Sequence, residues 1–403
     1  MIQPYKYKAY NIRGRPVRGV ISAANEVDLY NQLKTAGLDL VSCSALGSGG
    51  KLGLFRPKIK TRDLIQLFMH LLQMQSAGVP MLESLADVRD SADNQTLKDV
   101  ITDVHRSVSE GSSLSESLAN YPKYFSSIII SLIAAGEETG DLEMSYTQLI
   151  DYLKWRDDMN SKIRKATRYP MILLVVIIGT IGFMMTIVVP QIVGFIKNLG
   201  QELPSYTTAL INTSEFFQNH WLGMILSIIG SVVAYKVLRK NSEVFAFKMD
   251  SLFLRLPIVG VLLRKISIAR YTRTFGALFS SGIDILGCLK SAQETVSNLA
   301  LIEALGVVQV QVQSGSPLSK AFSASGEFPT LVTRMIKIGE ESGNLTPVLS
   351  QVSEFYSKDV DESIQGLITM LEPMLTAILG LTIAWIAAAV FGPIYSSFEH
   401  IQT

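Results

Sequence analysis

Cysteine and histidine are scarce in this sequence of 403 residues. The two cysteines, Cys43 and Cys288, lie outside any CxxC or Cys/His cluster, and the four histidines have no ligand spacing. A zinc site or a disulfide framework needs such side chains in clusters or pairs, so neither is expected. The sequence also lacks a phosphate-binding loop, a nucleophile elbow, an HExxH motif and a dinucleotide fingerprint. We therefore predict no enzymatic activity, no cofactor and no metal.

Charge is also sparse, because Asp, Glu, Lys and Arg make up only 18% of the residues, and the formal net charge is +1. A nucleic-acid partner would require a clustered excess of Lys and Arg, so none is predicted. The hydrophobic share of 48% and the mean hydropathy of +0.29 indicate a membrane protein. The first residues, MIQPYKYKAYNIRGR, are charged where a secretory signal is apolar, so we expect no cleavable signal peptide.

Three apolar segments are long enough to cross a bilayer. Met171–Val189 has no charge and, at about 1.5 Å per residue, would reach about 28 Å. Trp221–Leu238 is slightly shorter and holds Lys236 near its end, where a lysine can reach the interface. Pro373–Phe391 is again charge-free. A buried helix of a soluble protein is the alternative for each segment.

The basic residues beside these segments predict the orientation. Six lysines and arginines lie between Lys154 and Arg168, ahead of the first span, whereas only Lys197 lies between Pro190 and His220. Further basic residues follow the second span, and none follows the third. By the positive-inside rule, the N-terminus is cytoplasmic and the C-terminus lies outside, with the basic clusters against membrane lipids.

The chain contains an internal repeat at a separation of 203 to 204 residues. SAGVPMLESL resembles SSGIDILGCL, VSEGSSLSESL resembles VQSGSPLSKAF, and GEETGDL resembles GEESGNL. Pro170 and Pro190 are expected to bracket the first span, as Pro373 and Pro393 bracket the third. The middle span then returns the chain, so that both copies face the cytoplasm.

The predicted fold class is an all-α polytopic membrane protein with two homologous cytoplasmic helical bundles, three transmembrane helices and a small N-terminal α/β domain. Each copy should hold four to six short helices, since apolar residues recur at helical spacing between Gly and Pro corners. In the N-terminal domain, a hairpin should be followed by a helix from Asn25 to Gly37 and a third strand, LDLVSC. The predicted segments are 1–57 (N-terminal domain), 58–168 (repeat 1), 169–196 (first span), 197–216 (periplasmic loop), 217–238 (second span), 239–372 (repeat 2), 373–393 (third span) and 394–403 (periplasmic tail).

The paired acids of GEExGxL are the strongest chemical motif. We expect Gly136 and Gly339 to end one helix, with the acids near the start of the next, where the helix dipole favours them. A cation site and a proton shuttle are the alternatives. The positions interpreted as structural or interface residues are Gly78, Gly111, Gly136, Glu137, Glu138, Gly140, Leu142 and Pro170, matched by Gly282, Gly315, Gly339, Glu340, Glu341, Gly343, Leu345 and Pro373.

These motifs, in this order and in duplicate, resemble the GspF/PilC family of inner-membrane platform proteins. The resemblance includes YKYKAYNIRGRPVRG near the start of the chain and RYTRTFGALFSSG, which ends at Gly282. The resemblance covers almost the whole chain. It implies a platform of a type II secretion or type IV pilus machine that couples a cytoplasmic hexameric ATPase to pilin or pseudopilin assembly. It also implies other inner-membrane assembly subunits as partners and a homo-oligomer. Secretion, pilus and competence systems are not distinguished.

A transporter with parallel repeats is the alternative function, although the first and third spans lack the ionisable residues that a transporter requires. A membrane-anchored enzyme or signalling protein is a second alternative without a motif to support it.

Overall fold

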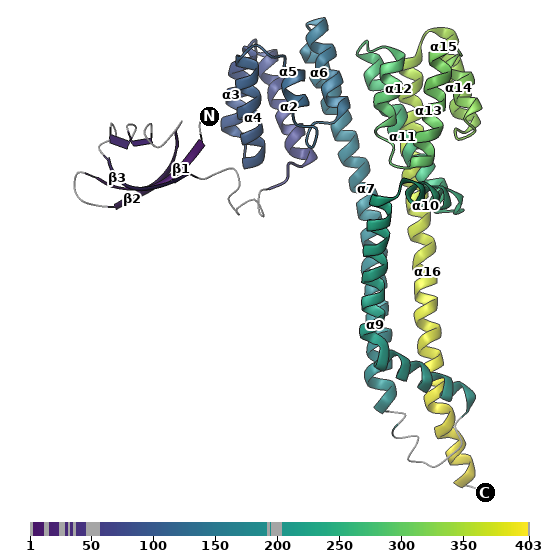
Figure 1. Ribbon diagram of the computed structural model, residues 1–403. Helices are drawn as coiled ribbons and strands as arrows, with labels where there is room; N and C mark the ends of the chain where they lie inside the picture. The colour runs from purple at the N-terminus through teal and green to yellow at the C-terminus, as the bar shows by residue number, and fades with distance from the viewer. Residues whose placement is uncertain are drawn as a thin grey trace. The chain divides into compact units, whose positions relative to one another are not determined.

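The computed structural model describes residues 3–11, 16–23, 29–30, 33–34, 38–45, 57–191, 194 and 204–401. The chain forms two compact units (Figure 1). One consists of residues 1–59 with 91–100, and the other of residues 60–90 with 101–403.

The first unit contains a three-stranded antiparallel sheet of order β2-β1-β3, formed by β1 (Gln3–Asn11), β2 (Pro16–Ala23) and β3 (Leu38–Ala45). Tyr7 on the central strand pairs with Gly19 on one side and Cys43 on the other. The helical residues Leu29 and Leu33 are buried against this sheet. The predicted hairpin strands and third strand are confirmed, whereas residues 12–15, which connect the hairpin strands, and the predicted helix ends at 25 and 37 lie outside the described residues.

The second unit contains the two copies of the repeat. The first copy is formed by α2 (Thr61–Ser76), α3 (Met81–Ser91), α4 (Gln95–Ser109), whose first residues belong to the other unit, α5 (Leu114–Ala119), α6 (Ser127–Thr139) and the start of α7 (Leu142–Phe183). The second copy is formed by α11 (Val259–Ser280), α12 (Ile285–Gln293), α13 (Leu299–Gln313), α14 (Leu318–Ala324), α15 (Thr330–Ser342) and the start of α16 (Leu345–Ile401). The order of helices is therefore the same in both copies, as the sequence predicts.

Glycines with a positive φ form the same three corners in each copy. In this left-handed region a side chain would be strained, so glycine is the residue that lets the chain turn. The φ angles are 76° and 82° at Gly78 and Gly282, 101° and 87° at Gly111 and Gly315, and 75° and 69° at Gly140 and Gly343.

The cores of the two bundles follow the predicted stripes. In α2 the apolar face packs on α7, with Leu67 and Phe68 buried. In α11 the equivalent face packs on α16, with Tyr271 and Phe275 buried.

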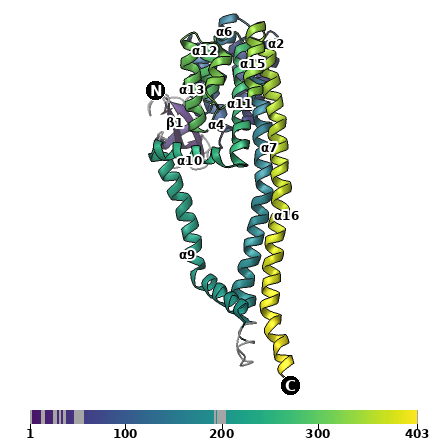
Figure 2. The same cartoon turned by 90° about the vertical axis from the view of Figure 1, so that its right-hand side faces the viewer.

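The long helices continue directly into apolar membrane-length segments. Three helical stretches qualify as candidate spans: Leu142–Gln191, Ser205–Asn241 and Leu345–Gly392. Their apolar parts expose large side chains, such as Ile172 at 63% and Leu381 at 72%, which is expected of lipid-facing residues. Figures 1 and 2 show α7, α9 (Ser205–Asn241) and α16 as the three extended helices.

The prolines that flank the first and third apolar segments do not end the helices. Helical structure runs through Pro170, Pro190, Pro373 and Pro393. In an apolar environment backbone groups have no water to bind, so a helix that loses one hydrogen bond at a proline still outcompetes an open chain. Helix α9 begins at Ser205, so the second half of the segment predicted as an outer connection, 197–216, is helical.

Beyond α7, a π-helical turn, η2 (Met184–Val188), meets the first turns of α9 and the end of α16. The shared core contains Met185, Leu210 and Ile386. The hydroxyl of Thr207 donates to the carbonyl of Ala389 at 2.9 Å. The ends of the long helices are thus packed together.

The second copy is preceded by α10 (Glu243–Arg255), which packs on α11 and α13.

Candidate functional site

The GEExGxL motif adopts a different local structure from the predicted one. Gly136 lies inside α6, which continues to Thr139 and ends at Gly140, and Gly339 lies likewise inside α15, which ends at Gly343. The acids therefore occupy the last turn of one helix rather than the start of the next. A Cβ on Gly136 would lie 2.8 Å from Cβ of Ser145 in α7, so glycine is the residue that permits this close helix contact.

The first acid of each pair reaches back to the N-terminus of a short preceding helix. Glu137 accepts hydrogen bonds from the backbone N–H of Leu114 at 2.5 Å, and from the N–H and the hydroxyl of Ser115. Glu340 accepts the equivalent three bonds, from the N–H of Leu318 at 2.6 Å and from the N–H and hydroxyl of Ser319 at 3.1 and 2.7 Å.

This arrangement satisfies free N–H groups at a helix start, where the positive end of the helix dipole also favours a carboxylate. Since three donors already point at each carboxylate, a cation would meet N–H and O–H groups rather than free oxygens.

The negative charge of Glu137 also acts on Tyr146 in α7. Burial, with a further contribution from Glu137, raises the pKa of this tyrosine.

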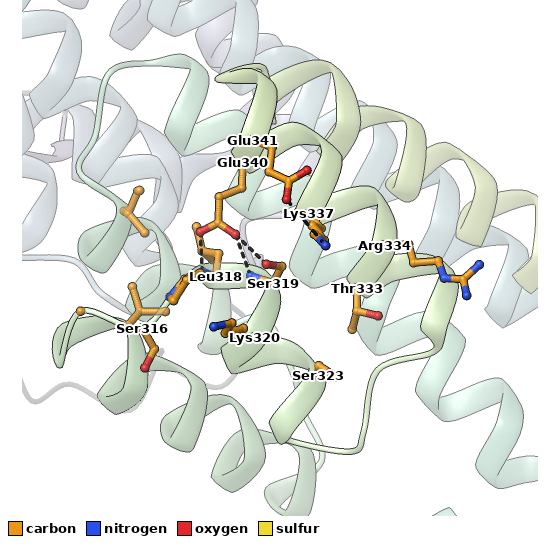
Figure 3. A pocket seen from close by; sticks show the side chains of 14 residues that line it. Ser316, Leu318, Ser319, Lys320, Ser323, Thr333, Arg334, Lys337, Glu340 and Glu341 are labelled. Atoms are coloured by element: carbon orange, nitrogen blue, oxygen red, sulfur yellow. Dashed lines mark hydrogen bonds and ion pairs between the residues drawn. The ribbon is translucent and has the colours of Figure 1, made fainter.

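Beside Glu340 the second copy carries a groove of about 890 Å³ between α14 and α15, shown in Figure 3. Its lining includes Lys320 from α14 and Arg334 and Lys337 from α15. Lys337 contacts Glu341 at 3.7 Å, and both side chains remain more than 60% exposed. Over the described ranges, no carboxylate lies within 4.0 Å of Lys320 or Arg334. The groove therefore presents basic side chains to solvent.

The first copy has no basic counterpart of this groove. By the repeat alignment, Lys320, Arg334 and Lys337 correspond to Glu116, Ser131 and Ala134. The two glutamates are shared by both copies. The five positions therefore carry a formal charge of −3 in the first copy (Glu116, Glu137 and Glu138) and +1 in the second (three basic residues and two acids). The two copies share a fold but present opposite charges at the same place.

The structure brings some of the predicted site residues together and not others. In each copy the motif Gly, Glu and Leu lie where the short helix, the next helix and the long helix meet. Pro170 and Pro373 lie some turns further along the long helices, within them. The sequence motifs do not include the basic residues of the groove, although these residues stand at positions where the side-chain charge differs between the two aligned copies.

Comparisons with known proteins agree with the duplicated architecture. The family model described as "Type II secretion system (T2SS), protein F" matches residues 67–190 and again 271–393. A second model, described as "Type II secretion system protein F, N-terminal domain", matches residues 3–44. The two matches of the first model fall on the two copies and the spans that follow them.

Individual relatives cover nearly the full length. The type IV pilus assembly protein PilC of Pseudomonas aeruginosa is 32% identical, over 87% of this chain and 92% of its own. PilC of Thermus thermophilus is 31% identical over 97% of both chains, and the type II secretion system protein F of Vibrio cholerae is 29% identical over 97% of both. From the duplicated bundles, the three apolar helices and these matches, the chain belongs to the type II secretion system protein F family.

Proposed function

We propose that this protein is the inner-membrane platform of a type IV pilus or type II secretion machine. In this role it couples a cytoplasmic hexameric ATPase to the assembly of pilin or pseudopilin subunits into a filament. Both bundles and the N-terminal domain face the cytoplasm, and the C-terminus lies outside. The protein performs no catalysis itself.

The observation that carries this proposal is the continuity of α7 and α16. Each begins inside a helical bundle and continues as the membrane-length helix, without a loop between. Helix α16 alone has 57 residues, which corresponds to about 86 Å. A displacement of a bundle is therefore passed to the membrane by a stiff element rather than absorbed by a linker.

The two long helices also contact each other ahead of their apolar segments (Figure 2). Lys162 of α7 contacts Asp361 of α16 at 2.7 Å, and the indole N–H of Trp155 donates to the hydroxyl of Ser357 at 3.1 Å. These contacts support movement of both helices as a pair when the ATPase acts on either bundle.

We assign the basic groove of the second copy to ATPase docking. Lys320, Arg334 and Lys337 are exposed and available for an acidic surface, and charge complementarity of this kind raises association rates and specificity.

On the membrane side, Ala384 and Ala388 lie one turn apart on an exposed face of α16 that a pilin helix could approach closely. Ala389 is instead fully buried within the chain's own core.

The test is a titration of the hexameric ATPase against the full-length protein in nanodiscs. Wild type should bind saturably, and the double variant Lys320→Glu/Lys337→Glu should bind at least about tenfold more weakly, with a smaller salt dependence. The matched control is Lys290→Glu, at an exposed lysine of α12 that does not line the groove, and it should bind as wild type does.

The outcomes separate the two parts of the proposal. If wild type does not bind the ATPase, the platform function is wrong. If wild type binds and the double variant binds equally well, the docking surface lies elsewhere on the two bundles.

A further inference from the structure

A second cavity, of about 320 Å³, lies where the two copies of the repeat meet. Its lining comes from four elements: the start of α6, the middle of α7, α11, and the residues that follow α12. The volume lies at the lower end of the range for small-molecule sites. The basic groove shares no lining residue with this cavity.

Two arginines line the cavity without an acidic partner. Arg156 comes from α7 and Arg270 from α11, and each is at least partly buried. Arg270 donates to the side-chain oxygen of Asn160 at 2.9 Å, which leaves its charge uncompensated. Within the described part of the chain, no carboxylate lies within 4.0 Å of either guanidinium. The cavity also contains Glu294, which instead accepts a hydrogen bond from the hydroxyl of Ser127.

The electrostatics of the pair are unfavourable as they stand. Burial, together with the positive charge of Arg156, lowers the pKa of Arg270. Two like charges at a partly desolvated position cost free energy unless an opposite charge is supplied.

The start of α6 adds a further feature that points to a ligand. Ser126, the N-cap residue, makes no side-chain bond to the first turn of its 13-residue helix. Its hydroxyl oxygen is buried and, among the described residues, has no hydrogen-bond partner. A buried hydroxyl without a partner is uncommon in folded proteins, and here it lines the cavity beside the positive end of a helix dipole.

We propose that this cavity binds a phosphate-bearing small molecule, with its phosphate between Arg156 and Arg270 and near the N-terminus of α6. A phosphate offers several acceptor oxygens and up to two negative charges, which matches two guanidinium groups, a free hydroxyl and a helix start better than a single carboxylate does. The remaining volume, beside Trp155 and Thr295, accommodates the group that carries the phosphate.

A ligand here bridges the two copies, because Arg156 belongs to the first and Arg270 to the second. Binding therefore stabilises the packing of one bundle on the other. This inference is independent of the proposed platform function, since it concerns binding to the isolated chain.

The experiment is calorimetric titration of the full-length protein in nanodiscs with inorganic phosphate and, separately, with AMP, at constant ionic strength maintained by chloride. Wild type should bind saturably and gain thermal stability on binding. Arg156→Gln and Arg270→Gln should each weaken binding by at least about tenfold. Arg62→Gln, which removes an exposed arginine paired with Asp157 on α7, is the matched control and should bind as wild type does.

The melting temperature without ligand shows whether each variant is folded. Because Arg156→Gln removes a like-charge repulsion, its melting temperature without phosphate should equal or exceed that of wild type, while the increase caused by phosphate should disappear. Tighter binding of AMP than of phosphate would assign the ligand to nucleotides, and equal binding would assign it to free phosphate. No saturable binding of either by wild type, or unchanged binding by a folded Arg156→Gln protein, would overturn the proposal.

Discussion

At the residue scale, the two glutamates of each motif differ in what they contact although they are adjacent in sequence. Glu340 accepts three hydrogen bonds at the start of α14, whereas Glu341 is exposed and contacts only Lys337 at 3.7 Å among the described partners. Charge-assisted bonds to a helix start stabilise more than an exposed ion pair does. In the first copy Glu137 accepts the equivalent bonds at the start of α5, whereas Glu138 is exposed.

We therefore expect Glu340→Gln to lower the stability of the second bundle by about 1–2 kcal/mol, because the amide loses the negative charge and one acceptor. Glu341→Gln should change it by less than about 0.5 kcal/mol. Thermal unfolding of the full-length protein in detergent, followed by circular dichroism, measures both. Equal effects of the two variants would contradict the assigned capping role.

At the element scale, the helix in which each bundle ends is the helix that enters the membrane. A stiff connection of this kind transmits displacement, whereas a flexible linker dissipates it. The segment of α7 between Lys162, which contacts Asp361 of α16, and the first span has no loop, and it includes Ala166, Thr167 and Arg168.

Replacing these three residues with glycine should weaken the helix by about 1 kcal/mol per residue relative to alanine. ATPase binding should stay within about twofold of wild type because the bundles are unchanged, whereas filament assembly or secretion in cells should fall by at least about tenfold. The matched control carries alanine at all three positions, keeps the helix and should retain assembly. If the glycine variant assembles filaments normally, helix continuity is not the means of coupling.

At the scale of the whole molecule, the three spans and the duplication together imply that both bundles share one side of the membrane. The basic residues ahead of the first span support the cytoplasmic side. Cysteine labelling can test this orientation, provided that the native thiols do not react with the reagent. Cys288 is fully buried, and burial raises its pKa to about 12, so it remains a protonated thiol near neutral pH.

With Cys43 replaced by serine, a cysteine at Asn212, an exposed position near the start of α9, should react with a membrane-impermeant maleimide in intact spheroplasts. A cysteine at Asn344, an exposed position between α15 and α16, should react only after permeabilisation. Labelling of the second position in intact spheroplasts would reverse the proposed orientation.

The sequence by itself determined the features that depend on local composition. Span length follows from the number of consecutive apolar residues, and the order of helices follows from glycine corners and apolar spacing. The duplication is visible because both copies keep the same corners, which the structure confirms through the positive φ angles of Gly78 and Gly282.

Only the tertiary structure decided which distant groups meet. Glu137 contacts the helix start at Leu114, 23 residues earlier, and Arg270 donates to Asn160 across 110 residues. Neither pairing follows from periodicity, because the orientation of one helix on another depends on how whole side-chain surfaces pack. The helical course through Pro170 was also beyond the sequence, since a local propensity against helix was outweighed by the apolar surroundings of the complete element.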